Sequence, residues 1–281
     1  MGQLSAGTPE WASLSHAYGP ALDTPQHLSR LRSEHATVRQ QAWYDLIGSA
    51  YHQGDLYPVT PWIVMPLMDL AIEPRYPDRA DAMAYVTLIV EDLHYHLDQR
   101  DGLRQQDSSS DNPRRSHRDQ LLTECRRMAT DRANDVQSLT QDVDPEIRRW
   151  ALRVFGVLAR VEAAEGSHLR DSLTDPDPLT RAVGMWQLKI TSRDQHHVSR
   201  SAAQLADNAE RNALDYFMAH VVLLSDRHMP KTSAREILRL QDLVGPDFEK
   251  AGLHHVAESP MVFAVVLSEV GSEVEVEALA G

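Results

Sequence analysis

The sequence predicts an all-α protein, an α-solenoid of stacked helical pairs, and three observations favour this fold class. The chain of 281 residues contains only 13 glycines, and alternating runs of β-branched residues are scarce. Ala, Leu, Arg, Glu and Gln are common, and apolar residues recur three and four positions apart, as on one face of a helix. Similar helical segments also return along the chain at regular spacing, which is typical of repeat proteins.

The best-defined helix is predicted over residues 144–162, DPEIRRWALRVFGVLARVE. Asp144 is of a residue type that caps helix N-termini, and Pro145 suits the first turn, where a missing N–H costs nothing. Apolar residues follow at intervals of 4, 3 and 4, at Ile147, Ala151, Val154 and Leu158. One face of this helix is therefore expected to be buried.

The same construction returns elsewhere in the chain. Residues 139–158 and 173–188 both combine Leu-Thr, an acidic turn, a proline and an arginine that leads into an apolar stripe. Arg148 and Arg181 occupy matching places and are 33 residues apart. Arg39, in an earlier segment of the same kind, precedes Arg148 by 109 residues, about three units of that size. This spacing predicts helical pairs that bury their apolar faces only against neighbouring pairs.

These segments resemble HEAT repeats, and the chain is similar to bacterial HEAT-repeat proteins. The family pattern places an aspartate in the turn between two helices and an arginine six residues later. The residues that carry this pattern, together with the arginine of the first repeat, are Arg39, Asp142, Arg148, Asp175 and Arg181. Ser33 stands where the first repeat would have its aspartate. The resemblance implies that these residues form a structural ladder along the stack.

A polar, serine-rich segment interrupts the repeats at residues 98–118 and contains almost no apolar side chains. Such a composition cannot bury enough surface to become ordered, so a mobile loop is expected. The loop divides the chain into an N-terminal helical block, 1–97, and a C-terminal helical block, 119–281, whose acidic tail should fray. Because the repeat resumes after the loop, one continuous solenoid is predicted.

Residues 49–70, SAYHQGDLYPVTPWIVMPLMDL, read as the connection between two helices. The first helix is expected to end near Gly54, and the second to begin after residues 60–61, Thr-Pro. His52 and Gln53 can then cap free carbonyls of the first helix. The alternative is that this connection contacts a ligand or a partner, because loops carry much of the variable function of a scaffold.

The leading hypothesis is a non-enzymatic scaffold that binds a protein or peptide on its concave face. No glycine-rich phosphate loop, GxSxG or HExxH motif occurs, so neither a catalytic residue nor a cofactor is predicted. Aromatic side chains on inward-facing helices, and the polar residues of the connection, are the expected contacts. These candidate binding residues are Tyr44, His52, Gln53, Tyr57, Trp62 and Tyr216.

Two other function classes remain open at this point. The chain could be an enzyme or a small-molecule-binding protein, with a pocket in the solenoid groove that includes His52, Tyr57 and neighbouring acids. Alkylpurine DNA glycosylases also use a HEAT-like scaffold, with a basic concave face and a catalytic aspartate. The net charge of −13 opposes this class and nucleic-acid binding in general, because phosphate contacts need clustered Lys and Arg.

The residues EDLHYHLD, 91–98, are the most metal-like cluster, but their spacing argues against a metal site. His94 and His96 are two positions apart and would point to opposite sides of a helix. The single cysteine, Cys125, supports neither a disulfide nor a cysteine-based zinc site. No apolar run is long enough to span a membrane, so no membrane partner is expected. The expected location is the cytoplasm.

Overall fold

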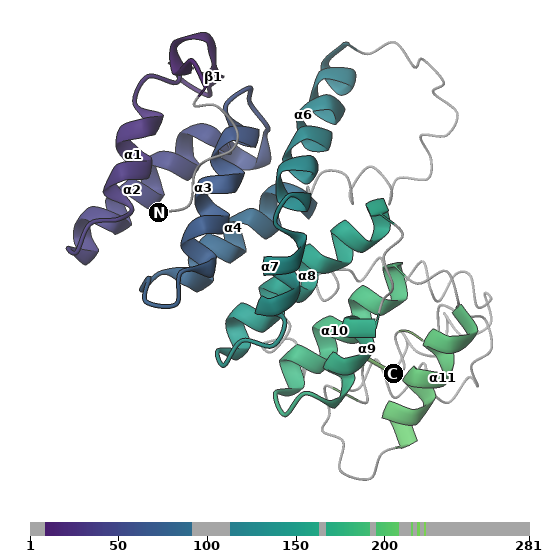
Figure 1. Ribbon diagram of the computed structural model, residues 1–281. Coiled ribbons are helices and arrows are strands. Elements are labelled where there is room, and N and C mark those ends of the chain that lie inside the picture. The colour runs from purple at the N-terminus through teal and green to yellow at the C-terminus, as the bar shows by residue number, and fades with distance from the viewer. Residues whose placement is uncertain are drawn as a thin grey trace, which may run out of the picture. The chain divides into compact units, whose positions relative to one another are not determined.

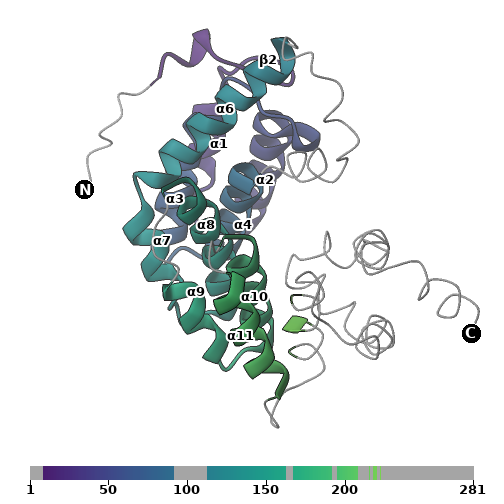
Figure 2. The ribbon, with the colours of Figure 1, turned by 90° about the vertical axis from the view of Figure 1, so that its right-hand side faces the viewer.

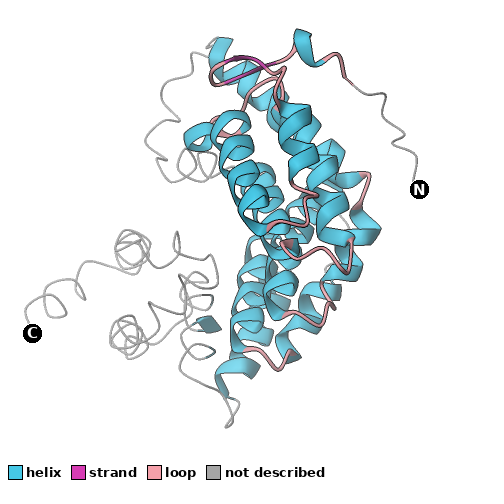
Figure 3. Cartoon of the chain, turned by 90° about the vertical axis from the view of Figure 1, so that its left-hand side faces the viewer, coloured by secondary structure: helices cyan, strands magenta, loops and turns pink. Residues whose placement is uncertain are grey.

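The computed structural model describes residues 9–91, 113–162, 167–191 and 195–207, together with positions 215, 218, 219 and 222. The chain divides into two compact units, residues 1–135 (unit 1) and residues 136–281 (unit 2). The described residues are mostly helical (Figures 1 and 3), as the sequence predicts. Their one sheet is a two-stranded antiparallel hairpin, β1 (Ser15–His16) and β2 (Gly19–Pro20).

Unit 1 contains short 3-10 turns, the hairpin and a set of packed helices. Its other elements are η1 (Trp11–Ser13), α1 (Thr24–Arg30), α2 (Ala36–Ala50), η2 (His52–Gly54), α3 (Thr60–Ile72), α4 (Arg79–Glu91) and α6 (Pro113–Thr130). Helix α1 packs on α2, α3 packs on α4, and α6 packs on both α3 and α4. The largest fully buried side chains of this unit are Leu31, Leu46, Ile63, Leu67, Met68, Leu70, Met83 and Ile89.

The β1–β2 hairpin is held against the helices by its backbone. Gly19 allows the tight turn, because its φ of 130° is strained for any residue with a side chain. The N–H of Ala17 donates to the carbonyl of Ser49 at the end of α2, at 3.0 Å. The carbonyl of Ser15 accepts from the N–H of Val59 at 3.2 Å, just before α3. The hairpin therefore lies over the connection between α2 and α3.

Unit 2 is built on α8 (Pro145–Glu162), the helix with the clearest sequence signal. Asp144 caps it as predicted, since Oδ1 accepts the N–H of Glu146 at 2.9 Å. Its predicted apolar stripe is buried. The other elements are α7 (Ala133–Leu139), which begins at the unit boundary, α9 (Ser167–Asp171), η4 (Ser172–Thr174), α10 (Pro178–Thr191) and α11 (Gln195–Asp207). Helices α8, α9 and α11 all contact α10, and α8 and α10 lie side by side in Figures 1 and 2.

The predicted C-terminal boundary of the polar loop, residue 118, is wrong. Helix α6 begins at Pro113, so residues 113–118 are helical rather than part of a loop. The first turns of α6 carry few apolar side chains, but further along Leu122, Cys125 and Met128 are buried, and α6 packs on α3 and α4. A helix anchored by such packing extends through polar residues that have no packing signal of their own. Residues 92–112 lie outside the described part of the chain.

Helix α6 also places the boundary between the two units later in the chain than the predicted polar loop. Because it packs within unit 1, the boundary between the units falls at 135/136 and not in the polar segment. Within the described ranges, no helix combines the length and the apolar character needed to cross a membrane.

Candidate binding pocket in unit 1

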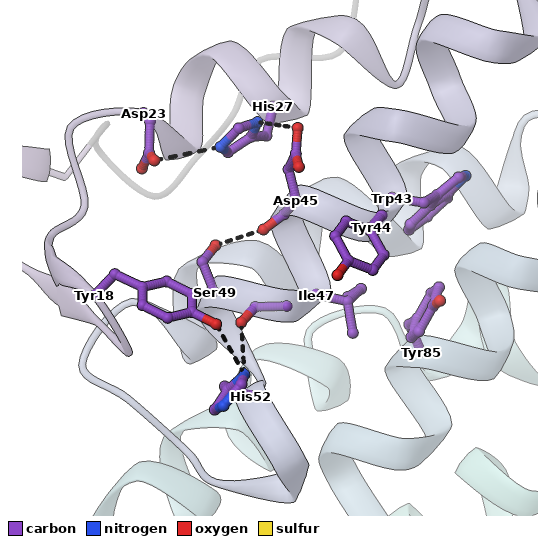
Figure 4. A pocket seen from close by; sticks show the side chains of 11 residues that line it. Tyr18, Asp23, His27, Trp43, Tyr44, Asp45, Ile47, Ser49, His52 and Tyr85 are labelled. Atoms are coloured by element: carbon purple, nitrogen blue, oxygen red, sulfur yellow. Dashed lines mark hydrogen bonds and ion pairs between the residues drawn. The ribbon is translucent and has the colours of Figure 1, made fainter.

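An open pocket of about 660 Å³ lies in unit 1 between the β-hairpin, α1, α2 and α4 (Figure 4). It is lined by Tyr18, Asp23, His27, Trp43, Tyr44, Asp45, Ile47, Gly48, Ser49, His52 and Tyr85. Figure 4 shows Asp23, His27 and Asp45 on one side and the rings of Trp43, Tyr44 and Tyr85 on another. The pocket thus combines carboxylates with aromatic faces.

Helix α2 supplies most of the pocket wall, and Gly48 leaves space in it. Tyr44 and Gly48 are one helical turn apart, so the tyrosine ring projects beside a position without a side chain. A Cβ placed on Gly48 would meet no heavy atom within 4 Å. The glycine therefore keeps this part of the pocket open without being needed for close packing.

Asp23 joins two histidines at one end of the pocket. Its Oδ1 lies 3.0 Å from Nε2 of His16, and its Oδ2 lies 3.4 Å from Nε2 of His27. Nδ1 of His16 accepts the backbone N–H of Tyr18 at 3.0 Å, so Nε2 of His16 carries the proton that Asp23 accepts. Burial alone would raise the pKa of Asp23, but hydrogen bonding to His16 and His27 and the electrostatic interaction with His16 lower it below its ordinary value.

Asp45 has fewer hydrogen-bonding partners than Asp23. Its Oδ1 accepts a hydrogen bond from Nε2 of Gln41 at 2.8 Å. Its Oδ2 has no hydrogen-bond donor among the described residues, and the nearest ring nitrogen is Nδ1 of His27 at 3.9 Å. That nitrogen is itself shielded from solvent and has no hydrogen-bond partner in the described chain.

The aromatic side of the pocket has one packed pair and one exposed ring. Trp43 and Tyr85 stack with ring centroids 5.1 Å apart and an interplanar angle of 27°. Nε1 of Trp43 donates to Oδ2 of Asp78 at 3.3 Å, which fixes the indole. Tyr44 is 77% exposed beside this pair. An exposed tyrosine next to a fixed aromatic pair is a ready contact surface for a ligand.

The connection after α2 makes several contacts that hold the ends of α2 and α3 together. Helix α2 ends at Ala50, and Gln53 has a φ of 54°, in the left-handed region, directly before Gly54. Nδ1 of His52 donates to the carbonyl of Gly48 at 3.0 Å, and Oη of Tyr18 lies 3.3 Å from the same nitrogen. The hydroxyl of Thr60 donates to the carbonyl of Ala50 at 2.5 Å, which ties the start of α3 to the end of α2.

Only two of the predicted binding residues line the pocket, namely Tyr44 and His52. Gln53 is exposed in the turn, and Trp62 is half-buried on α3. Tyr57 is also half-buried, and burial, with the nearby Asp55 and Tyr18, raises the pKa of its hydroxyl. Tyr216 lies outside the described residues.

Sequence reasoning missed most of the acidic and aromatic lining. Asp23 and His27 are four residues apart, a spacing that places both on one helix face and could have been noticed. Asp45 joins them from a second helix and Tyr85 from a third. No local spacing indicates such contacts, because they depend on which helices pack together.

The three repeated arginines have one common geometry. Nη1 of each donates to the backbone carbonyls six and five residues earlier, at 2.6–3.3 Å. Each guanidinium also binds a later carboxylate, in the pairs Arg39–Asp78, Arg148–Asp175 and Arg181–Asp215. The preceding aspartate thus contributes its carbonyl, and the carboxylate comes from further along the chain. Since any residue has a carbonyl, Ser33 serves Arg39 as well as an aspartate would.

The metal-like cluster stays largely untested, because all of it except Glu91 falls outside the described residues. Within the described parts, no group of three or more His, Cys, Asp or Glu side chains is arranged to hold a metal ion. Cys125 is a buried free thiol. Comparison with known proteins adds no assignment, since neither a family model nor a curated protein matches the sequence.

Proposed function

We propose that the protein is a non-enzymatic α-solenoid of HEAT-like helical pairs that binds a protein or peptide partner, with the unit 1 pocket as an anchor site. The repeated arginine geometry supports the architecture. Each of these arginines binds the carbonyls of the turn before it and also a carboxylate further along the chain. The pairs are Arg39–Asp78, Arg148–Asp175 and Arg181–Asp215, which are 39, 27 and 34 residues apart. Contacts that couple one helical pair to the next are what stacked repeats require.

The observation that carries the binding proposal is the exposure of Tyr44 at the pocket. A tyrosine 77% exposed to water, beside the stacked rings of Trp43 and Tyr85, is of the residue type that most often anchors partners. In arrays of HEAT-like pairs the second helix of each pair lines the concave face. Helix α2, which carries Tyr44, is the second helix of the α1–α2 pair.

Gly48→Leu is the sharpest test of this proposal. The leucine would fill the pocket from α2, while the space around Gly48 lets the fold remain intact. Partners captured by the full chain from host extracts would be identified, produced separately and titrated against wild-type protein and variant. We expect Gly48→Leu to weaken binding by about tenfold or more, which corresponds to about 1.4 kcal/mol.

Gly48→Ala is the matched control, because it changes the same position but adds only one methyl group. It should bind partners as the wild type does. Thermal melting of both variants establishes that the fold is retained. If Gly48→Leu binds every identified partner with unchanged affinity, the pocket is not the anchor site.

A second candidate function is small-molecule binding or catalysis in the same pocket. Its volume of about 660 Å³ lies within the range of about 300–1,000 Å³ typical of small-molecule sites. His27 and Asp45 also present polar atoms to each other at its wall. Native mass spectrometry of protein purified from its host should then reveal a bound small molecule that is absent from Gly48→Leu.

A further inference from the structure

The unit 1 pocket carries negative charge that the described chain does not neutralise. Two carboxylates, Asp23 and Asp45, line it, and no Lys or Arg side chain of the described ranges does. Asp23 is held by two histidines, as shown above. Asp45 accepts one hydrogen bond, from Gln41, and lies 3.9 Å from His27, and its side chain is 28% exposed. The side chain of Asp23 is more exposed, at 49%, but both of its oxygens face histidines, so Oδ2 of Asp45 is the carboxylate oxygen of the pocket that still lacks a hydrogen-bond donor within the described ranges.

The contact of His27 with Asp23 bears on Oδ2 of Asp45, the oxygen that Gln41 does not bind. Nε2 of His27 faces a carboxylate oxygen of Asp23 at 3.4 Å, so in the neutral form of the ring the proton sits on Nε2. Its Nδ1 then presents a lone pair toward Oδ2 of Asp45, 3.9 Å away. His27 is 9% exposed, and this nitrogen has no hydrogen-bond partner in the described chain. Two electron-rich atoms at this distance, one of them desolvated, create a negative potential that a cation relieves.

The aromatic lining selects among cations. The Trp43–Tyr85 stack and the exposed ring of Tyr44 line the side of the pocket opposite Asp23, His27 and Asp45, as Figure 4 shows. Aromatic faces attract cations, and a guanidinium stacks on them better than an ammonium because it is planar and more weakly hydrated. A guanidinium can also donate to Oδ2 of Asp45, whose neighbour on α2 is the exposed Tyr44. The volume of about 660 Å³ leaves room for the side chain and adjoining backbone of a peptide.

We infer that the unit 1 pocket binds an arginine side chain of the partner, with Asp45 as the charge contact and Tyr44, Tyr85 and Trp43 as the aromatic wall. This inference rests on the proposed partner-binding function and names the chemistry of the partner. The acidic net charge of −13 favours the approach of a basic segment.

Three short peptides test this inference on the full chain by ligand-observed NMR titration at low salt. They are acetyl-Gly-Arg-Gly-amide and its counterparts with lysine and with citrulline, which is neutral but has nearly the shape of arginine. We expect the arginine peptide to bind about tenfold or more tightly than the citrulline peptide, and more tightly than the lysine peptide. Asp45→Asn should weaken the arginine peptide about tenfold and leave the citrulline peptide unchanged.

Asp131→Asn is the control variant, because it removes one negative charge from unit 1 at an exposed ion pair with Arg127 outside the pocket. It should leave all three affinities unchanged. Equal binding of arginine and citrulline, equal binding of arginine and lysine, or an Asp45→Asn effect no larger than that of Asp131→Asn would each overturn the inference. If an identified partner still loses affinity to Gly48→Leu in that case, the proposed function stands and only the arginine specificity fails.

Discussion

Arg181 holds Asp215 through two parallel hydrogen bonds, with Nε donating to Oδ1 at 2.9 Å and Nη2 donating to Oδ2 at 2.6 Å. The side chain of Asp215 is only 2% exposed. The same guanidinium donates to the carbonyl of Asp175 at 2.6 Å. One residue therefore joins the turn before α10 to a buried carboxylate 34 residues further along the chain.

Breaking this pair should cost much more than breaking an exposed one. Arg181→Ala removes two charge-assisted hydrogen bonds from a buried carboxylate and is expected to lower the free energy of unfolding by about 3–5 kcal/mol. Denaturant unfolding of Arg181→Ala, Asp215→Ala and the double variant measures the coupling between the two residues. The control pair is Arg32–Glu73, with side chains 53% and 48% exposed, which should couple by about 0–1 kcal/mol. Equal couplings for the two pairs would contradict a structural role of the repeated arginine.

The glycines at positions 48 and 19 should respond to alanine in opposite ways. Gly48 lies inside α2 with free space around it, so Gly48→Ala is expected to stabilise the protein by about 0.5–1 kcal/mol through higher helix propensity. Gly19 also has free space, but its φ of 130° is strained for alanine. Gly19→Ala should therefore destabilise by about 1–3 kcal/mol. Thermal unfolding of both variants decides this, and a loss of stability in Gly48→Ala would show that the space around it is occupied.

Asp78 should contribute to the loss of stability in acid. Burial raises the pKa of its carboxyl, but hydrogen bonds from Arg39 and Trp43 and the charge of Arg39 bring the pKa below the ordinary value of 3.8. A carboxyl with a lowered pKa in the folded state contributes stability that is fully present above the ordinary pKa. This stability is lost as the pH falls through the lower, folded-state pKa. Urea unfolding of wild type and Asp78→Asn from pH 6 down to about pH 3 should give a shallower acid decline for the variant. Parallel curves would mean that other groups account for the decline.

We expect no appreciable binding of duplex DNA at physiological salt. The net charge of −13 repels phosphate, and DNA affinity is built from many Lys and Arg contacts that release counterions. Fluorescence anisotropy with a labelled duplex at about 150 mM salt checks this. Sub-micromolar binding independent of DNA sequence would instead revive the DNA-glycosylase alternative.

Local patterns were sufficient to predict individual helices. Asp144 and Pro145 indicated the start of α8, and the apolar intervals after them indicated its buried face, because capping and helical periodicity act within a few residues. The start of α6 at Pro113 was not predictable in this way. The polar residues at that end carry no packing signal, and the helix is held by contacts that its later residues make with α3 and α4.

By itself the sequence determined that the chain is mostly helical, where its clearest helix begins, and that arginines recur at matching places. The tertiary structure decided which carboxylate each arginine binds, because Asp78 and Asp215 lie 39 and 34 residues beyond their partners. It also decided the candidate site, since the pocket needs Asp45 and Tyr44 from α2, His27 from α1 and Tyr85 from α4. Helix propensity and capping are short-range forces that local sequence encodes, whereas the meeting of side chains from different helices depends on how apolar faces pack across the whole unit.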